Sequence, residues 1–128
     1  MKKLLIFTFL IILVQIVSAQ KIYVEPTSEG IEQPIIDKLL KLKKNIVTNQ
    51  ENSDFTIKCV ILSPGKLKAE GNVEIYDTKT NKMLARSKLV SARLTAFHGY
   101  SSTEIVVMKK IAKDYLYKVL FEAEKAKK

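Results

Sequence analysis

The sequence predicts an α+β domain of the order strand, helix, strand, strand, strand, helix, with a single sheet of about four strands and two helices on one face. Apolar residues recur three or four positions apart between residues 31 and 46, and again between residues 105 and 120, which is the spacing of an amphipathic helix. Between residues 54 and 90 they alternate with polar residues, as in strands that bury one face. Strands buried on one side need helices to cover that side, so the two patterns together predict the layers.

The first 19 residues have the features of a secretory signal peptide. Lys2 and Lys3 precede a mostly apolar run, and Val17 and Ala19 stand three and one places before a cleavage point. An uncleaved membrane anchor is the alternative, but the apolar run of residues 4–17 is shorter than the roughly 20 residues that a spanning helix needs. We therefore expect cleavage and export, to the periplasm or the medium.

The expected mature chain, residues 20–128, is one domain of 109 residues, long enough for a modest core without disulfides. Loss of Lys2 and Lys3 lowers its formal net charge from +9 to +7, because residues 1–19 contain no Asp or Glu. Bacterial lipoproteins need a cysteine after the cleavage point, whereas this chain has Gln20, so no lipid anchor is expected. Cys59 has no internal disulfide partner, and its place on the apolar side of a strand favours burial over pairing with another chain.

A short strand and a helix open the domain. Residues 21–25 are expected to be extended, and the apolar stripe of residues 31–46 predicts the helix. Regular helix should begin near Gln33, because Pro34 is tolerated only in a first helical turn. The polar run of residues 48–53 is expected to end it.

Two adjacent strands follow, at residues 54–62 and 66–76. We expect Ile61 to pair with Leu67, which places all the alternating apolar side chains on one buried face. A two-residue turn at residues 64–65 would instead slip the register by one. The burial pattern takes precedence, since such a slip would turn one strand's apolar side chains outward. The strand at residues 21–25, joined to the next through a helix, should run parallel to it if the two are neighbours.

A second hairpin leads to a third antiparallel strand. Pairing of Ile75 with Met83 would place Glu70 between Lys58 and Lys88 on the polar face of the sheet. Each such cross-strand pair contributes about 0.2–1 kcal/mol, which supports this meander of strands.

Residues 91–100 are ambiguous, and we interpret them as a strand end followed by a loop. Ser101 is then expected to open the last helix, with Glu104 in the capping-box position. The apolar stripe of residues 105–120 must pack on the sheet. Residues 122–128 have few apolar side chains and are expected to fray.

No residue pattern indicates catalysis or metal binding, and we assign no catalytic, cofactor-binding or metal-ligating residue and no cofactor. His98, the single histidine, lies in a polar loop without partners at the spacings that a triad or metal site requires. Cys59, on an inner strand face, lacks the exposed, electropositive setting of a reactive thiolate. Glu70 and Glu74 share a strand face, but an open sheet has no cleft to drive their pKa values apart. We therefore expect a protein that is not an enzyme.

Charge and the polar sheet face are the remaining functional features. Because the lysines are spread along the chain, a solubilising surface is favoured, with attraction to acidic envelope surfaces as the alternative. The partner is expected to be another envelope protein or an anionic envelope polymer, and not nucleic acid. The expected docking face carries Lys58, Lys68, Glu70, Asn72, Glu74, Tyr76, Leu84, Arg86, Lys88 and Val90.

The segments SDFTI at residues 53–57 and GNVEIYDTKTNKML at residues 71–84, followed by a long closing helix, carry a resemblance. They resemble small bacterial envelope domains: the periplasmic domain of the curli secretion channel, the lipoprotein activators of penicillin-binding proteins and the amino-terminal domain of TolB. The resemblance covers most of the mature chain and implies a noncatalytic exported module that binds another envelope component. The missing lipidation cysteine departs from the lipoproteins, and no functional residue is carried over. The alternative is a small exported hydrolase or ligand-binding domain that uses the loop at residues 97–102.

Overall fold

The computed structural model describes residues 20–63, 67–93 and 102–127. The predicted signal peptide at residues 1–19, the predicted turn at residues 64–65 and Ser101 lie outside the described residues. The elements are β1 (Lys21–Val24), α2 (Gln33–Lys41), β2 (Asn45–Ile46), the short 3-10 helix η1 (Gln50–Asn52), β3 (Phe55–Ser63), β4 (Lys68–Asp77), β5 (Met83–Arg86), β6 (Val90–Arg93), α3 (Thr103–Asp114) and α4 (Leu116–Lys127).

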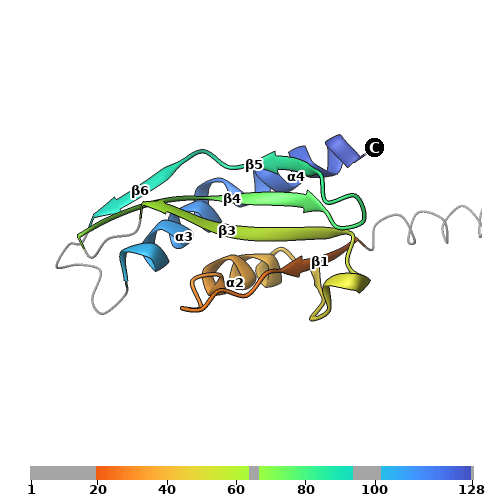
Figure 1. Cartoon of the computed structure of the whole chain (residues 1–128), viewed down its shortest axis with the longest axis horizontal. Helices are drawn as coiled ribbons and strands as arrows, with labels where there is room; N and C mark the ends of the chain where they lie inside the picture. Colours follow the sequence, from red (N-terminus) through yellow and green to blue (C-terminus); the bar gives the residue numbers. More distant parts are fainter. Residues whose placement is uncertain (1–19, 64–66, 94–101, 128) are drawn as a thin grey trace, which may run out of the picture.

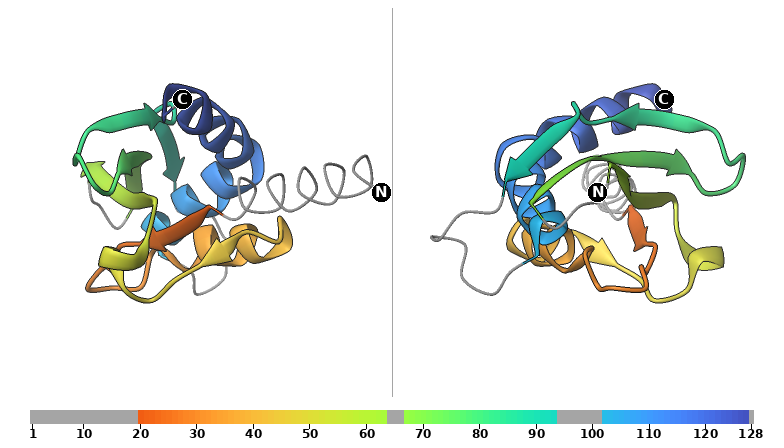
Figure 2. Two further views of the ribbon diagram at one scale, coloured as in Figure 1. Left: turned by 90° about the vertical axis from the view of Figure 1, so that its right-hand side faces the viewer. Right: turned by 60° about the vertical axis from the view of Figure 1, so that its left-hand side comes forward.

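The predicted α+β class is confirmed, with more strands and one more helix than expected. One mixed sheet has the order β2-β1-β3-β4-β5, and β6 pairs with β4 beyond the end of β5. As predicted, β1 lies parallel to β3, and it is also parallel to β2, a two-residue strand that the sequence pattern did not indicate. All three α-helices lie against the sheet, and Figures 1 and 2 show α3 and α4 crossing behind β4, β5 and β6 while α2 lies beside α3.

The first helix ends earlier than predicted. It begins at Gln33 as expected, with Pro34 in its first turn, but it stops at Lys41. Lys43 has a left-handed backbone (φ 57°), and its N–H donates to the Leu40 carbonyl, which closes the last turn. The apolar spacing reaches Ile46 only because that residue continues into β2, beside β1.

The predicted pairing of β3 with β4 was wrong by four residues, although the faces were right. Ile61 pairs with Gly71 rather than with Leu67, which lies before β4 and is 73% exposed. An even shift keeps every apolar side chain on the same face, so alternation alone does not separate the two registers. A bulge between Ile61 and Ser63 adds a further irregularity that the pattern does not reveal.

The pairing of the third strand was wrong by two residues, and the strand is interrupted. Ile75 pairs with Ala85 rather than with Met83, and β5 stops at Arg86. The chain resumes pairing with β4 only at Val90, where β6 begins.

Ser87 bridges the interruption between β5 and β6. Its Oγ accepts the Val73 N–H at 2.9 Å, and its own N–H donates to the Val73 carbonyl at 2.8 Å. The break changes the register, so Val90 pairs with Gly71 and packs against the core. Leu84 also packs against the core, and the prediction that Leu84 and Val90 lie on the polar face was wrong.

The predicted last helix is two helices. α3 and α4 meet at Tyr115, whose φ of −126° is not helical. α3 is capped by Ser102, which accepts the Ile105 N–H at 3.2 Å, one residue later than the predicted Ser101.

The prediction that residues 122–128 fray was wrong as far as Lys127. α4 runs to that residue, and Ala123 is fully buried. The Lys127 ammonium donates to the Asp54 carbonyl at 3.0 Å and lies 4.9 Å from the centroid of the Phe55 ring. These contacts hold the last turn of α4 against the start of β3.

The hydrophobic core lies between the inner face of the sheet and the helices. Its largest fully buried side chains are Phe55, Ile22, Ile35, Leu39, Ile57, Ile75, Met108, Ile111 and Leu116. Gly71 is part of the same inner face and leaves no room for a side chain. A Cβ there would lie 2.5 Å from the Val60 carbonyl oxygen and 2.9 Å from Cδ1 of Ile61.

Candidate functional site

On the polar face of the sheet, basic and acidic side chains stand beside one another and neutralise each other's charge. Across β3, β4 and β5, Lys58 stands beside Glu74 and Glu74 beside Arg86, so Glu74 takes the place predicted for Glu70. Arg86 Nη1 lies 3.9 Å from Glu74 Oε2, and Lys58 Nζ lies 3.9 Å from Glu25 Oε2. This face offers a charged partner little net charge.

Glu70 and Glu74 do not form a paired acid and base. Glu70 Oε1 lies 3.1 Å from Lys68 Nζ, whereas Glu74 accepts a hydrogen bond from the Tyr76 hydroxyl at 3.3 Å. Desolvation, together with the negative charge of Glu74, raises the pKa of Tyr76 above its ordinary value. The two carboxylates therefore belong to separate salt-bridged groups.

The predicted docking face is also more closed than expected. Asn72, near its centre, is only 5% exposed, and among the described residues its Oδ1 has no hydrogen-bond partner. Of the ten residues predicted to form the face, only Lys68, Arg86 and Lys88 are exposed. Little of this surface is open to a partner.

Cys59, to which no catalytic role was assigned, lies partly buried against the core. Burial, with smaller contributions from Glu32 and Glu25, raises the pKa of the Cys59 thiol from 9.0 to about 12. The thiol is therefore protonated at neutral pH and is a poor nucleophile. His98 and residues 97–101 of the predicted loop lie outside the described residues.

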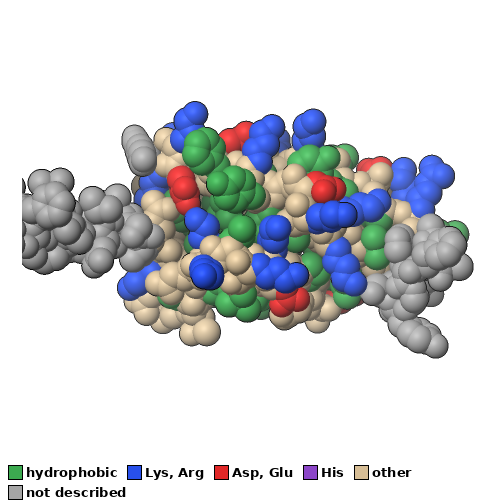
Figure 3. Space-filling view, turned by 180° about the vertical axis from the view of Figure 1, so that it is seen from behind, with side chains coloured by type: hydrophobic (Ala, Val, Ile, Leu, Met, Phe, Trp, Pro, Cys, Tyr) green, Lys and Arg blue, Asp and Glu red, His purple; other side chains and the backbone are tan. Residues whose placement is uncertain are grey.

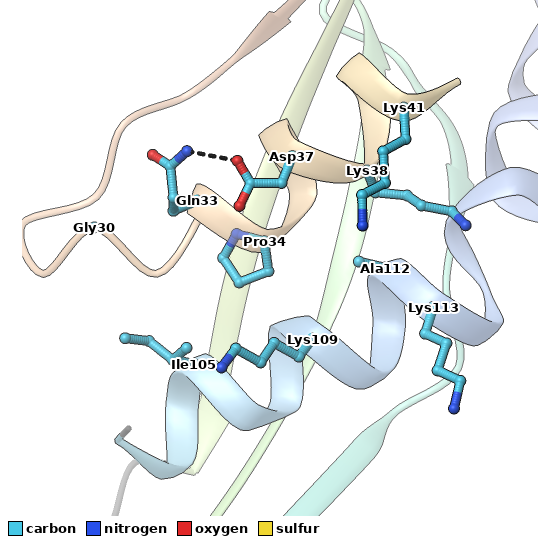
Figure 4. Close-up of a pocket in the computed structure, with 10 residues that line it drawn as sticks. All are labelled: Gly30, Gln33, Pro34, Asp37, Lys38, Lys41, Ile105, Lys109, Ala112 and Lys113. Carbon is cyan, nitrogen blue, oxygen red and sulfur yellow. Dashed lines mark hydrogen bonds between the residues drawn. The ribbon is translucent and has the colours of Figure 1, made fainter. Parts of the chain in front are cut away.

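A groove lies between α2 and α3 on the helix side of the molecule. Its volume is about 530 Å³, within the range of small-molecule sites. Pro34, Ile105 and Ala112 supply apolar surface, and Figure 4 shows Pro34 facing α3 with lysine side chains from both helices around it. The residues that line it are Gly30, Gln33, Pro34, Asp37, Lys38, Lys41, Ile105, Lys109, Ala112 and Lys113.

The charge of this groove is not compensated as that of the sheet face is. In residues 20–63, 67–93 and 102–127, no carboxylate oxygen lies within 4.0 Å of the ammonium of Lys38, Lys41 or Lys113. The single carboxylate of the groove, Asp37, accepts a hydrogen bond from the Gln33 amide at 2.9 Å. The groove therefore combines apolar surface with an excess of positive charge.

Exposed aromatic side chains lie on α4, on the same side of the molecule. Tyr117 is 65% exposed and Phe121 is 53% exposed. Figure 3 shows hydrophobic side chains at the surface of this side, with Lys and Arg side chains around them and few Asp or Glu. Lys44 lies 3.5 Å from Glu124 at the edge of this aromatic surface.

The sequence interpretation missed the groove, although a weak signal was present. Lys38 and Lys41 are three residues apart, and Lys109 and Lys113 are four apart, so each pair shares one helix face beside the apolar stripe. The two pairs line one groove because α2 packs beside α3. The spacing of residues along each helix does not predict this packing.

No group of three or more His, Cys, Asp or Glu side chains that could hold a metal ion occurs among the described residues. None of the helices within this part of the chain is long and apolar enough to cross a membrane.

Solved structures of several bacterial proteins are similar in fold to this chain. A hypothetical protein, CT253, from Chlamydia trachomatis has a TM-score of 0.57 at 12% identity, over 83% of this chain and 99% of that chain. A minor lipoprotein from Acinetobacter baumannii has a TM-score of 0.53 at 12% identity, over 84% and 93% of the two chains. The chain therefore resembles this bacterial lipoprotein in fold.

TolB from Acinetobacter baumannii also matches, with a TM-score of 0.53 at 10% identity. The match covers 83% of this chain and 28% of TolB, which confirms the predicted resemblance to TolB at the level of the fold. No protein-family model and no curated protein matches the chain. At these identities the likeness concerns the fold alone.

Proposed function

We propose that the protein is an exported, noncatalytic binding or assembly module of the bacterial cell envelope, and that it binds an anionic envelope component in the groove between α2 and α3. The single observation that carries this proposal is a set of three groove lysines, Lys38, Lys41 and Lys113, that have no acidic partner within the described part of the chain. Like charges held together on a surface raise the local potential and attract anions. An anionic partner would relieve this repulsion.

Two further observations support the proposal. The fold resembles that of a bacterial lipoprotein, in keeping with the predicted signal peptide and a periplasmic or extracellular location. The only cysteine is partly buried and protonated, which favours binding over thiol catalysis. The finer resemblance to the curli-channel domain and to activators of penicillin-binding proteins stays a prediction.

The alternative, a small exported hydrolase or ligand-binding domain, depends on the loop at residues 97–102. Only Ser102 of that loop belongs to the described part of the chain, where it caps α3. The alternative therefore stays a prediction, and the groove is the better supported site.

Retention on a heparin resin tests the proposed function. The variant Lys38→Glu/Lys113→Glu reverses two groove charges and should elute at lower salt than the unchanged protein. The control Lys79→Glu/Lys82→Glu makes the same change of net charge at two exposed lysines near the β4–β5 hairpin. Equal elution of the two variants would show that net charge, not the groove, sets the retention and would overturn the proposal.

A further inference from the structure

We propose that the helix side of the protein binds the surface of an anionic lipid bilayer, with Tyr117 and Phe121 inserted among the lipid headgroups. The groove lysines and the lysines of α4 would then face the lipid phosphates. This inference rests on the proposed function and names its partner. The inference also requires a different chemistry of the partner. A bilayer offers an apolar layer beneath its anionic surface, whereas a dissolved polyanion does not.

The two aromatic side chains are placed as an insertion pair. They are four residues apart on α4 and therefore lie on one face of the helix. The adjacent face of the helix, with Leu116 and Leu120, is at most 2% exposed and packs in the core. Tyr117 and Phe121 are thus not needed to fill the core. Aromatic side chains of this kind prefer the boundary between water and lipid.

Two lysines accompany the pair on α4, together with the exposed side chain of Glu122. The Lys125 ammonium lies 5.6 Å from the centroid of the Phe121 ring, and Lys118 is exposed on the same helix. Glu124, at the edge of the pair, is neutralised by Lys44. An anionic bilayer complements this arrangement, because it attracts lysines at its surface and accepts aromatic rings beneath them.

Two other occupants fit less well. The hollow beside the aromatic rings, formed with Lys44, Leu120 and Glu124, has a volume of only about 60 Å³, too small to enclose a ligand. A second copy docked on the same face would bring the lysines of both copies together, and like charges across an interface oppose binding. A bilayer needs neither a deep pocket nor a charge-reversed partner.

A single tryptophan reporter tests insertion, because the chain contains no tryptophan. The test uses the exported product as recovered from cells, mixed with phosphatidylglycerol–phosphatidylcholine vesicles or with pure phosphatidylcholine vesicles. Phe121→Trp should shift its emission to the blue and be quenched by brominated acyl chains, with the anionic vesicles only. Leu67→Trp reports from an exposed position at the opposite end of β4 from α4, and its emission should not change. An unchanged Phe121→Trp spectrum would overturn the inference.

Vesicle sedimentation of paired variants separates the inference from the proposed function. Tyr117→Ser/Phe121→Ser should bind anionic vesicles at least about tenfold more weakly and still bind heparin, whereas Lys38→Glu/Lys113→Glu should lose both. Leu67→Ser/Leu89→Ser removes another exposed apolar pair and should bind vesicles like the unchanged protein. If the aromatic variant also binds vesicles like the unchanged protein, Tyr117 and Phe121 do not insert, the inference fails and the groove proposal stands. If the unchanged protein binds neither vesicles nor heparin, both proposals fail.

Discussion

Gly71 occupies a crowded position between two strands and a helix. Besides the Val60 carbonyl oxygen, Cγ1 of Val107 on α3 would lie 3.4 Å from an added Cβ. The nearest of these atoms belongs to the backbone and cannot rotate away. A side chain at this position therefore forces the sheet or α3 to move.

Gly71→Ala should lower the free energy of unfolding by about 1–3 kcal/mol through overpacking. Urea unfolding measures the change. Ser91→Ala, at an exposed position in the adjacent β6, is the control and should stay within about 0.5 kcal/mol of the unchanged protein. Equal stability of Gly71→Ala would mean that β3 and β4 are further apart than described.

Ser87 replaces a backbone acceptor where β5 is interrupted. Ser87→Ala leaves the buried Val73 N–H without its partner and should destabilise the protein by about 1–3 kcal/mol. Hydrogen exchange of the Val73 amide should accelerate beyond the change expected from global stability. Ser63→Ala, exposed at the end of β3, gives the matched comparison. Unchanged exchange at Val73 would contradict the described hydrogen bond.

The thiol of Cys59 gives the stability a defined dependence on alkaline pH. Its folded-state pKa of about 12 exceeds the ordinary value of 9.0, so the unfolded chain releases the thiol proton first as pH rises. The contribution of this thiol to stability should be fully present below pH 9 and should decline between pH 9 and 12. Cys59→Ala lacks this decline. The test compares the urea midpoints of the two proteins below and above pH 9. If the midpoints of both proteins change equally with pH, the result would count against the burial of the thiol.

At the scale of elements, strand faces could be predicted from the sequence and strand registers could not. Alternation determines which side chains are buried, and the inner face of β3 and β4 was predicted correctly. Registers that differ by an even number of residues bury the same faces, so Ile61 could pair with Leu67 or with Gly71 under one pattern. The bulges at Ser63 and near Tyr76 change the register, and no repeating pattern in the sequence indicates where they lie.

The ends of the helices were harder to predict than their faces. The period of residues 31–46 crosses from α2 into β2, because both elements place apolar side chains against the same core. The groove was missed for a related reason, since its lysines belong to two helices that are far apart in the sequence. Local spacing predicts which side of each helix is polar, and only packing brings the polar edges together.

The last turn of α4 depends on Lys127. Lys127→Ala removes the contacts to Asp54 and Phe55 and should lower stability by about 1 kcal/mol. Amide exchange at the end of α4 should rise locally. Lys118→Ala, exposed on the same helix, should change neither quantity. Equal behaviour of the two variants would place the end of α4 away from β3.

For the whole molecule, the two sides differ in how their charges are satisfied. Within the described residues, the sheet side pairs Lys58, Lys68 and Arg86 with carboxylates, whereas Lys38, Lys41 and Lys113 of the groove have no carboxylate oxygen within 4.0 Å. A formal net charge alone does not reveal this division, because it sums over both sides. The prediction that the sheet side is the docking surface followed from its alternating polar side chains and from the expectation that both helices cover only the other face.

Export is testable on the intact chain. We expect the product recovered from the periplasm or the medium to begin at Gln20, because Val17 and Ala19 fit a signal peptidase site. Mass spectrometry of the intact protein reads this directly. Ala19→Lys places a large charged residue at the cleavage point and should leave the leader attached. A full-length mass for the unchanged exported protein would favour the uncleaved anchor.

The position of β1 has a consequence for the order in which the chain folds. β1 lies between β2 and β3, and the Lys21 N–H donates to Asp54 Oδ2, 33 positions further along the chain. A chain that emerges with its amino terminus first therefore presents β1 before any of its strand partners exists. Parallel pairing over such separations forms slowly, because a long loop must close before the contacts are made. β1 leaves the ribosome or a translocation channel ahead of all other strands. It stays unpaired until β2 has emerged, and its pairing with β3 is complete only when Ile57, 33 positions after Val24, has followed.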